Sequence, residues 1–159
     1  MCLSSRAMFA LSLLLAVAAA QAVESSTSKD SSMPADAVWK KIGDFCGIAA
    51  WHPAIAKCDL STDKQQRTLT LKGGGSIVER LVRWNSKSRS YTYRIVSGPL
   101  PVVHYQSTLR VVAAKHGTGS VLTWSGHYGS AKGTSDSDAK KTIDGIYESG
   151  LAALADSPP

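Results

Sequence analysis

Residues Ala139–Leu154 read AKKTIDGIYESGLAAL, and their apolar members recur at the spacing of one helix face. Positions three, four, seven, eight and eleven residues apart share a side of a helix, and here they are Ile143, Ile146, Tyr147, Gly150, Leu151 and Leu154. Ser135 or Asp136 can cap the start of this helix, and Pro158 and Pro159 lie beyond its end. The stretch predicts a long C-terminal helix whose apolar stripe needs another element to cover it.

The region before this helix is rich in short segments with strand character. In RTLTLK, for example, Leu69 and Leu71 fall on one face. The predicted strands are Lys57–Thr62, Arg67–Lys72, Ser76–Trp84, Ser90–Val96, His104–Ala114 and Ser120–Tyr128. Because short polar turns separate them, they predict an antiparallel meander. Ser97–Pro101 is predicted as a connection, since proline cannot donate to a strand ladder.

Two short helices are expected ahead of these strands. Pro34–Asp44 carries an apolar face at helical spacing, with Ser31 and Ser32 as candidate caps. Ile48–Trp51 is predicted as a second helical turn, which Pro53 ends because the residue before a proline avoids helical geometry. Val23–Met33 is polar and serine-rich, and it suits either a flexible leader or an edge strand. The elements together predict an α+β fold, a curved antiparallel sheet covered by the C-terminal helix.

The N-terminus has the features of a secretory signal peptide. Met1–Arg6 is short and basic, Ala7–Ala20 is continuously apolar, and Ala20-Gln21-Ala22 fits a cleavage site. We therefore predict a signal peptide over residues 1–22 and a single domain over residues 23–159, exported to the periplasm or the medium. The apolar run is too short to span a bilayer comfortably, so we expect no stable membrane insertion after cleavage. An uncleaved anchor is the alternative.

The charge distribution does not favour nucleic acid as a partner. The chain has 18 Lys and Arg residues against 12 Asp and Glu residues. No basic run is interleaved with aromatic residues, as nucleic-acid binding would require. The scattered basic residues are interpreted as solvated surface, and they include Lys40, Lys41, Arg67, Arg80, Arg83, Arg94, Arg110, Lys140 and Lys141.

Two cysteines, Cys46 and Cys58, lie outside the predicted signal peptide. An even number in an exported protein favours a disulfide, and closing this short loop would stabilise the fold by roughly 3 kcal/mol. Two buried thiols that never meet are the alternative. His52 lies between them, but no zinc-binding or phosphate-binding spacing is present. The sequence thus predicts neither a metal site nor a cofactor.

A series of short motifs resembles a known family. The motifs are Val38-Trp39, Gly43-Asp44-Phe45, Trp51-His52-Pro53-Ala54-Ile55, Glu79-Arg80-Leu81, Tyr91-x-Tyr93-x-Ile95, Pro99-Leu100-Pro101, Tyr105-x-Ser107 and Trp124-Ser125-Gly126. Their order is similar to the polyketide cyclase/dehydrase-like branch of the SRPBCC (START/birch-allergen) superfamily, with the exported bacterial MxaD-like group as the nearest match. The resemblance implies a helix-grip fold, in which about seven antiparallel strands wrap around the C-terminal helix and enclose a cavity. It also implies a first strand within Val23–Ser32.

The plant abscisic-acid receptors of this superfamily share part of the pattern. Their pocket residues match Glu79, Tyr105 and Ser107 here, and their two gate loops resemble Gly73-Gly74-Gly75 and Pro99-Leu100-Pro101. This chain departs from the receptors at three pocket positions, which hold His52, Trp124 and Tyr147. The resemblance therefore implies a pocket in the same place with a different ligand.

The residues themselves leave alternatives open. His52 can exchange a proton with a ligand near neutral pH, or it can be a turn histidine bonded to backbone. Glu79 lies between Ile77 and Leu81 on an apolar face, so it needs a ligand, a bond from Tyr105 or His52, a proton or a structural ion pair. The aromatic residues that could form a pocket wall, or simply pack in the core, are Tyr91, Tyr93, Tyr105, Trp124 and Tyr147.

Three functional hypotheses follow. The first is an exported protein that binds a small apolar or amphipathic molecule through His52, Glu79, Tyr93, Tyr105, Ser107, Trp124 and Tyr147 without transforming it. The second is a cyclase, dehydratase or isomerase that uses His52 and Glu79 as acid and base. The third, by resemblance to MxaD-like proteins, is an accessory protein that binds a periplasmic dehydrogenase.

Overall fold

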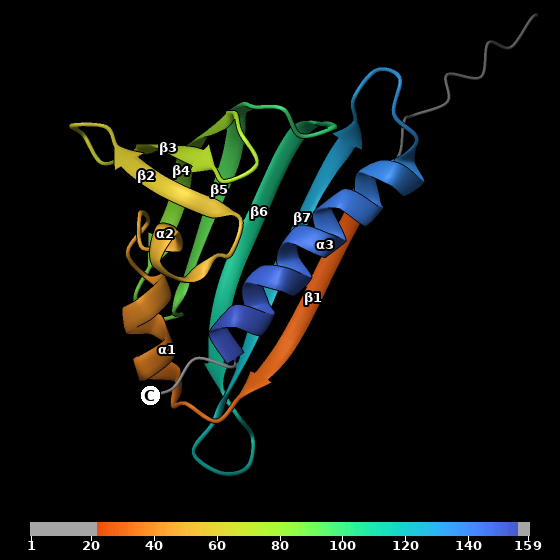
Figure 1. The fold of residues 1–159 in the computed structure, drawn as a ribbon. Helices are drawn as coiled ribbons and strands as arrows, with labels where there is room; N and C mark the ends of the chain where they lie inside the picture. Colours follow the sequence, from red (N-terminus) through yellow and green to blue (C-terminus); the bar gives the residue numbers. More distant parts are fainter. Residues whose placement is uncertain (1–21, 156–159) are drawn as a thin grey trace, which may run out of the picture.

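A computed structural model describes residues 22–155 and shows a curved antiparallel sheet with three helices against its concave face (Figure 1). The predicted signal peptide, except Ala22, lies outside the described residues. In chain order the elements are β1 (Val23–Ser31), α1 (Ala35–Ile42), α2 (Ile48–Trp51), β2 (Ile55–Leu60), β3 (Gln66–Leu71), β4 (Ser76–Asn85), β5 (Ser90–Ser97), β6 (Val102–Ala113), β7 (Ser120–Ser130) and α3 (Asp136–Ala155). The predicted α+β, helix-grip architecture is confirmed.

The sheet has seven strands in the order β1-β7-β6-β5-β4-β3-β2. β2 to β7 form the predicted meander, and β1 pairs with β7 from Val23↔Tyr128 to Ser31↔Ser120. The serine-rich segment is thus an edge strand and not a flexible leader. Its inward serines are buried because they find partners, and Ser25 Oγ lies 2.5 Å from Tyr128 Oη.

α3 lies along β1 and β7 and buries the predicted stripe, except that Ile146 is only half-buried (Figure 1). The helix begins at Asp136, and the predicted cap Ser135 is confirmed, because its hydroxyl accepts the Asp138 amide at 3.1 Å. Gly150 is required where the helix meets the interior. A Cβ built there would lie 2.6 Å from His52 Cδ2 and 2.8 Å from the Trp124 ring.

α1 and α2 cover the remaining concave surface (Figure 1). α1 begins at Ala35 without a side-chain cap, so the predicted capping by Ser31 or Ser32 is wrong. Ser31 ends β1, and its hydroxyl accepts the Met33 amide instead. Pro34 precedes the helix and has no N–H of its own to satisfy. α1 ends at Ile42, two residues earlier than predicted, whereas α2 has its predicted bounds.

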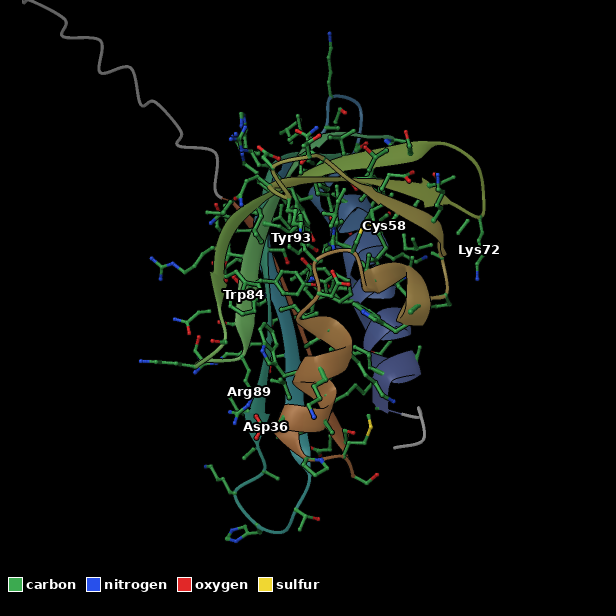
Figure 2. The ribbon with its side chains drawn as sticks, turned by 90° about the vertical axis from the view of Figure 1, so that its left-hand side faces the viewer. Asp36, Cys58, Lys72, Trp84, Arg89 and Tyr93 are labelled. Carbon is green, nitrogen blue, oxygen red and sulfur yellow. A yellow bond between two sulfur atoms is a disulfide. The ribbon has the colours of Figure 1, made fainter. Side chains whose placement is uncertain are left out.

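The far end of the sheet is attached to α1 by two side chains, shown in Figure 2. Trp84 Nε1 donates to the Gly43 carbonyl at 2.8 Å, and Arg89 Nε lies 2.6 Å from Asp36 Oδ1. Solvent-exposed ion pairs of this kind contribute little to stability. The two contacts together fix the position of α1 against the β4–β5 hairpin.

The predicted strand bounds are correct within two residues, and one of the two-residue differences falls at the start of β6. The strand begins at Val102, directly after Pro101, where His104 was expected. Val102 and Val103 pair with the end of β7 across a bulge, and His104 within it adopts a φ of 53°. Pro101 cannot donate a backbone hydrogen bond, so it correctly kept Ser97–Pro101 out of the predicted strand. It does not prevent the residues that follow it from pairing, so the strand can begin at Val102.

A disulfide joins Cys46 and Cys58, whose Cα atoms are 5.5 Å apart. The predicted disulfide is therefore confirmed. It connects the segment between α1 and α2 to β2, on which Cys58 lies (Figure 2). The disulfide therefore holds the segment before α2 against the edge strand β2.

Candidate ligand-binding cavity

A cavity of about 380 Å³ lies between the inner face of β3–β5, α2 and α3. Most of its lining is aliphatic, and the aliphatic residues are Ile48, Ala54, Ile55, Leu69, Leu71, Ile77, Ile95, Leu100, Ile143 and Ile146. Few polar side chains reach it. This composition and size are typical of small-molecule sites. A larger hollow of about 600 Å³ beside β1, β6 and β7 is lined almost entirely by polar residues, and it lacks that apolar character.

Five of the seven predicted binding residues line this cavity, and they are His52, Glu79, Tyr93, Tyr105 and Trp124. Ser107 and Tyr147 do not. They lie one layer behind, where Tyr147 stacks on the Trp124 ring with 4.7 Å between centroids and bonds the Tyr105 hydroxyl at 2.7 Å. The structure thus groups all seven but divides them into a lining and its support.

The predicted gate loops also divide. Gly73, Gly74 and Leu100 line the cavity, whereas Gly75, Pro99 and Pro101 do not. A Cβ on Gly75 would lie 3.8 Å from Pro99 Cγ, so the two loops approach each other beside the cavity. The φ values of 94° at Gly74 and 81° at Gly75 explain why glycine is needed there.

His52 ends α2 in an extended conformation and is 3% exposed. Its Nδ1 accepts the Ala54 amide at 3.2 Å, which leaves the ring proton on Nε2, 3.2 Å from the Ile146 carbonyl. Burial lowers the pKa of His52, and the Ile146 bond only partly offsets this effect. The imidazole is therefore neutral near pH 7. His52 is a turn histidine bonded to backbone that also lines the cavity.

Glu79 forms a structural ion pair, one of the alternatives that its sequence position left open, and its partner is Arg67, which the sequence did not identify. Arg67 Nε donates to Glu79 Oε2 at 2.6 Å, Arg67 Nη1 donates to the Phe45 carbonyl, and the guanidinium lies 4.1 Å from the Phe45 ring centroid. The interpretation of Arg67 as solvated surface is wrong, because its side chain is 0% exposed. Arg67 shares the inward face of β3 with Leu69 and lies opposite Glu79 in register. The alternation in RTLTLK carried that signal.

Burial and pairing act in opposite directions on these two groups. Burial raises the pKa of Glu79, and the adjacent Arg67 works against that rise. Burial disfavours the charged form of Arg67, but Glu79 together with Tyr91 and Tyr93 outweighs this effect, so the pKa of Arg67 stands above its usual value. The 2.6 Å contact between Arg67 Nε and Glu79 Oε2 is the geometry of a buried ion pair, in which Glu79 is a carboxylate. Among the residues described here, Arg67 Nη2 is buried without a hydrogen-bond partner.

A chain of hydroxyl groups runs behind the cavity wall. Trp124 Nε1 lies 3.1 Å from Tyr93 Oη, which lies 3.3 Å from Tyr105 Oη. Tyr105 Oη, Tyr147 Oη and Ser107 Oγ then follow at 2.7 Å intervals. Burial raises the pKa of Tyr93 and of Tyr105 well above the usual value. The phenols therefore stay protonated.

Residues 22–155 contain neither a helix suited to crossing a membrane nor a cluster of metal ligands. No helix among them is long and apolar enough to cross a membrane. No group of three or more His, Cys, Asp or Glu side chains in that range is placed to hold a metal ion.

The curved seven-stranded sheet, the long C-terminal helix and the cavity between them define a helix-grip protein. The model of the family described as polyketide cyclase / dehydrase and lipid transport matches residues 22–157, and the chain belongs to this family. The resemblance drawn from the sequence motifs is confirmed at this level. Membership of the MxaD-like group stays a prediction.

Several solved structures are similar. The protein XoxI from Bacillus cereus is 34% identical, with a TM-score of 0.81 over 84% of this chain and 93% of its own. An uncharacterised protein from Bacillus thuringiensis is 35% identical, with a TM-score of 0.80 over 83% and 96%. The Zhui aromatase/cyclase from a Streptomyces species is 16% identical and shares the fold, with a TM-score of 0.67 over 84% and 88%. No curated protein matches the chain.

Proposed function

We propose that this chain is an exported binding protein that holds a small, largely apolar ligand in the cavity without transforming it. The observation that carries the proposal is the cavity itself, about 380 Å³ in volume and lined mainly by aliphatic side chains. The family description, which includes lipid transport, supports a ligand of this kind. The polar tips of Tyr93 and Tyr105 and the carboxylate of Glu79 would orient one polar group of the ligand.

Export with cleavage of residues 1–22 is part of the proposal. The disulfide supports it, because disulfides persist in oxidising compartments. The test is N-terminal sequencing of the secreted or periplasmic chain. A sequence that begins at Val23 is the expected result, whereas a chain that retains residues 1–22 would contradict cleavage.

The polar side chains of the cavity already have hydrogen-bond partners, and this favours binding over catalysis. A general base needs a free lone pair within reach of its substrate. Both ring nitrogens of His52 have backbone partners, and Glu79 is held by Arg67. An acid–base pair of His52 and Glu79 would first have to break the backbone bonds of His52.

The accessory-protein alternative rests on exposed apolar residues as well as on the MxaD-like resemblance. Val82 on β4 and Val96 on β5 are 51% and 53% exposed. Isolated exposed valines are common on protein surfaces, so this observation weighs less than the cavity does.

Native mass spectrometry tests the binding function directly. The chain is expressed with residues 1–22, isolated from the compartment to which it is exported, and measured before and after denaturation. A stoichiometric extra mass that denaturation releases is expected. The variant Ile146→Trp, which fills the cavity, should lose that mass, whereas Val112→Trp on the exposed side of β6 should retain it.

Failure would take a defined form. An apo mass, together with no binding of the apolar fluorophore N-phenyl-1-naphthylamine, would contradict the binding function. A second protein that co-purifies with both variants would favour the accessory role.

A further inference from the structure

The hydroxyl chain behind the cavity has a fixed direction because each of its ends has a single role. At one end, the indole Nε1–H of Trp124 can only donate. At the other end, the Ser125 backbone carbonyl can only accept, and it accepts the Ser107 hydroxyl at 2.7 Å. Every hydroxyl between these ends has one proton to give.

The proton positions follow one by one from the Ser125 carbonyl. Ser107 has donated its proton, so at 2.7 Å it must accept from Tyr147. Tyr147 then accepts from Tyr105, also at 2.7 Å. Tyr105 accepts from Tyr93 at 3.3 Å, the longest link in the chain. Tyr93 accepts from Trp124 at 3.1 Å, so each proton points away from Trp124 and towards Ser125.

This direction decides what the wall offers to the cavity. Tyr93 and Tyr105 line the cavity, but both phenol protons are used inside the chain. Only their remaining oxygen lone pairs are free to face a ligand. Phenols can normally act as donor or acceptor, and this arrangement removes the donor role.

The other polar side chains of the lining add no donor. The ring proton of His52 is given to the Ile146 carbonyl. Glu79 is a carboxylate with one oxygen bound to Arg67 and the other left to accept. Trp124 gives its N–H to Tyr93. The unpartnered Arg67 Nη2 belongs to a fully buried side chain that is not part of the lining.

We propose that the cavity selects apolar ligands that carry an uncharged hydrogen-bond donor, namely an alcohol or a phenol, over ethers, ketones and carboxylates with the same skeleton. The hydroxyl of the ligand would donate to the oxygen of Tyr93 or Tyr105 or to the carboxylate of Glu79. A ligand that can only accept leaves these buried acceptors without a partner, and a carboxylate adds repulsion from Glu79. The inference rests on the proposed binding function, and it adds the chemical class of the ligand.

The test uses three probes with one ring skeleton: 2-naphthol, 2-methoxynaphthalene and 2-naphthoate. The first donates, the second can only accept, and the third accepts and is negatively charged. Affinities are measured by titration calorimetry on the exported chain with its disulfide intact. We expect 2-naphthol to bind more tightly than 2-methoxynaphthalene by roughly tenfold to a hundredfold, the usual cost of unsatisfied buried polar groups.

The variant Tyr147→Phe tests the direction of the chain without altering the cavity lining. It removes the acceptor of the Tyr105 proton and retains a ring that can stack on Trp124. One phenol proton is then free to turn towards the cavity. The ratio of the two neutral-probe affinities should fall towards one because 2-methoxynaphthalene gains a donor.

Tyr128→Phe is the matched control. It also deletes a buried phenol oxygen, which bonds Ser25 and takes no part in the chain. Its affinity ratio should equal that of the unmodified protein. Loss of stability alone would weaken both probes equally and leave the ratio unchanged. If Tyr147→Phe does not fold, Ser107→Ala interrupts the same chain one step further from the cavity.

The results of this test distinguish a failure of the donor selectivity from a failure of the proposed binding function. Equal or tighter binding of 2-methoxynaphthalene to the unmodified protein would overturn the donor selectivity and leave the binding function standing. An unchanged ratio in Tyr147→Phe would overturn the role of the chain. Binding of none of the three probes would contradict both the proposed cavity function and the inference.

Discussion

Replacing Arg67 by methionine should destabilise the protein severely at neutral pH. The side chain is fully buried, and it supplies the counter-charge of Glu79 at 2.6 Å. Methionine fills a similar volume but leaves a carboxylate uncompensated in the interior. Breaking a buried pair in this way costs about 3–5 kcal/mol. For a slope of about 2 kcal/mol per molar, the urea midpoint should fall by roughly 1.5–2.5 M.

The loss should depend on pH in a defined direction. Without Arg67, only burial acts on Glu79, so the folded-state pKa of Glu79 lies above its unfolded value. A raised carboxyl pKa means that the folded state binds more protons than the unfolded state. The stability of Arg67→Met should therefore rise as the pH falls through the folded-state pKa of Glu79 and level off below the usual value of 4.5.

The double variant Arg67→Met/Glu79→Leu is the control. It removes both charges, so most of the lost stability should return, and the extra pH dependence should disappear. Urea unfolding followed by circular dichroism at pH 7 and pH 5 measures all three proteins. A loss below about 1 kcal/mol for Arg67→Met, with no dependence on pH, would refute the buried pair.

Three further predictions concern the disulfide, α3 and the buried histidine. Replacing Cys46 and Cys58 by serine should lower the unfolding free energy by about 3 kcal/mol, and a reductant should lower the melting temperature of the unmodified protein only. Gly150→Ala should lower the unfolding free energy by about 1–3 kcal/mol, because the added Cβ has no room. Gly145→Ala on the same helix is the control: its Cβ meets no atom within 4 Å, so it should raise the unfolding free energy by about 0.5–1 kcal/mol. Equal effects of the two variants in urea unfolding would contradict the packing at Gly150. The pKa of His52 is lowered in the folded state, so its contribution to stability is lost as the pH falls from 6.5 through the folded-state pKa. Nitrogen NMR should show that the neutral ring with its proton on Nε2 persists below pH 6.5. Titration of His52 at pH 6.5 or above would contradict its burial.

The fold could be predicted because its main elements carry strong periodic signals. The stripe of α3 and the alternation in β3 to β7 each repeat over several residues, and the motif order pointed to the family. β1 lacked such a signal. Its inward serines are satisfied by partners such as Tyr128, which lies far along the sequence, so no local pattern separates this strand from a polar leader.

The site was predicted in outline and missed in its chemistry. Glu79 was recognised as a carboxylate that needs a partner, but its partner was taken for surface. Arg67 and Glu79 face each other only after β3 and β4 pair. The net charge of the chain does not show which basic residue is buried. The hydrogen bonds of His52 likewise join residues that only the packing of α3 brings together.

The placement of β1 sets the order in which the sheet can be completed. Ser25 and Tyr128 are 103 positions apart, yet they are neighbours across the pair formed by β1 and β7. The meander β2 to β7 can form hairpin by hairpin, but β1 has no surface to join until β7 is in place. Contacts of such long sequence separation slow folding. A strand in which every residue except Val23 is serine, threonine or charged can remain in water during that interval without aggregating.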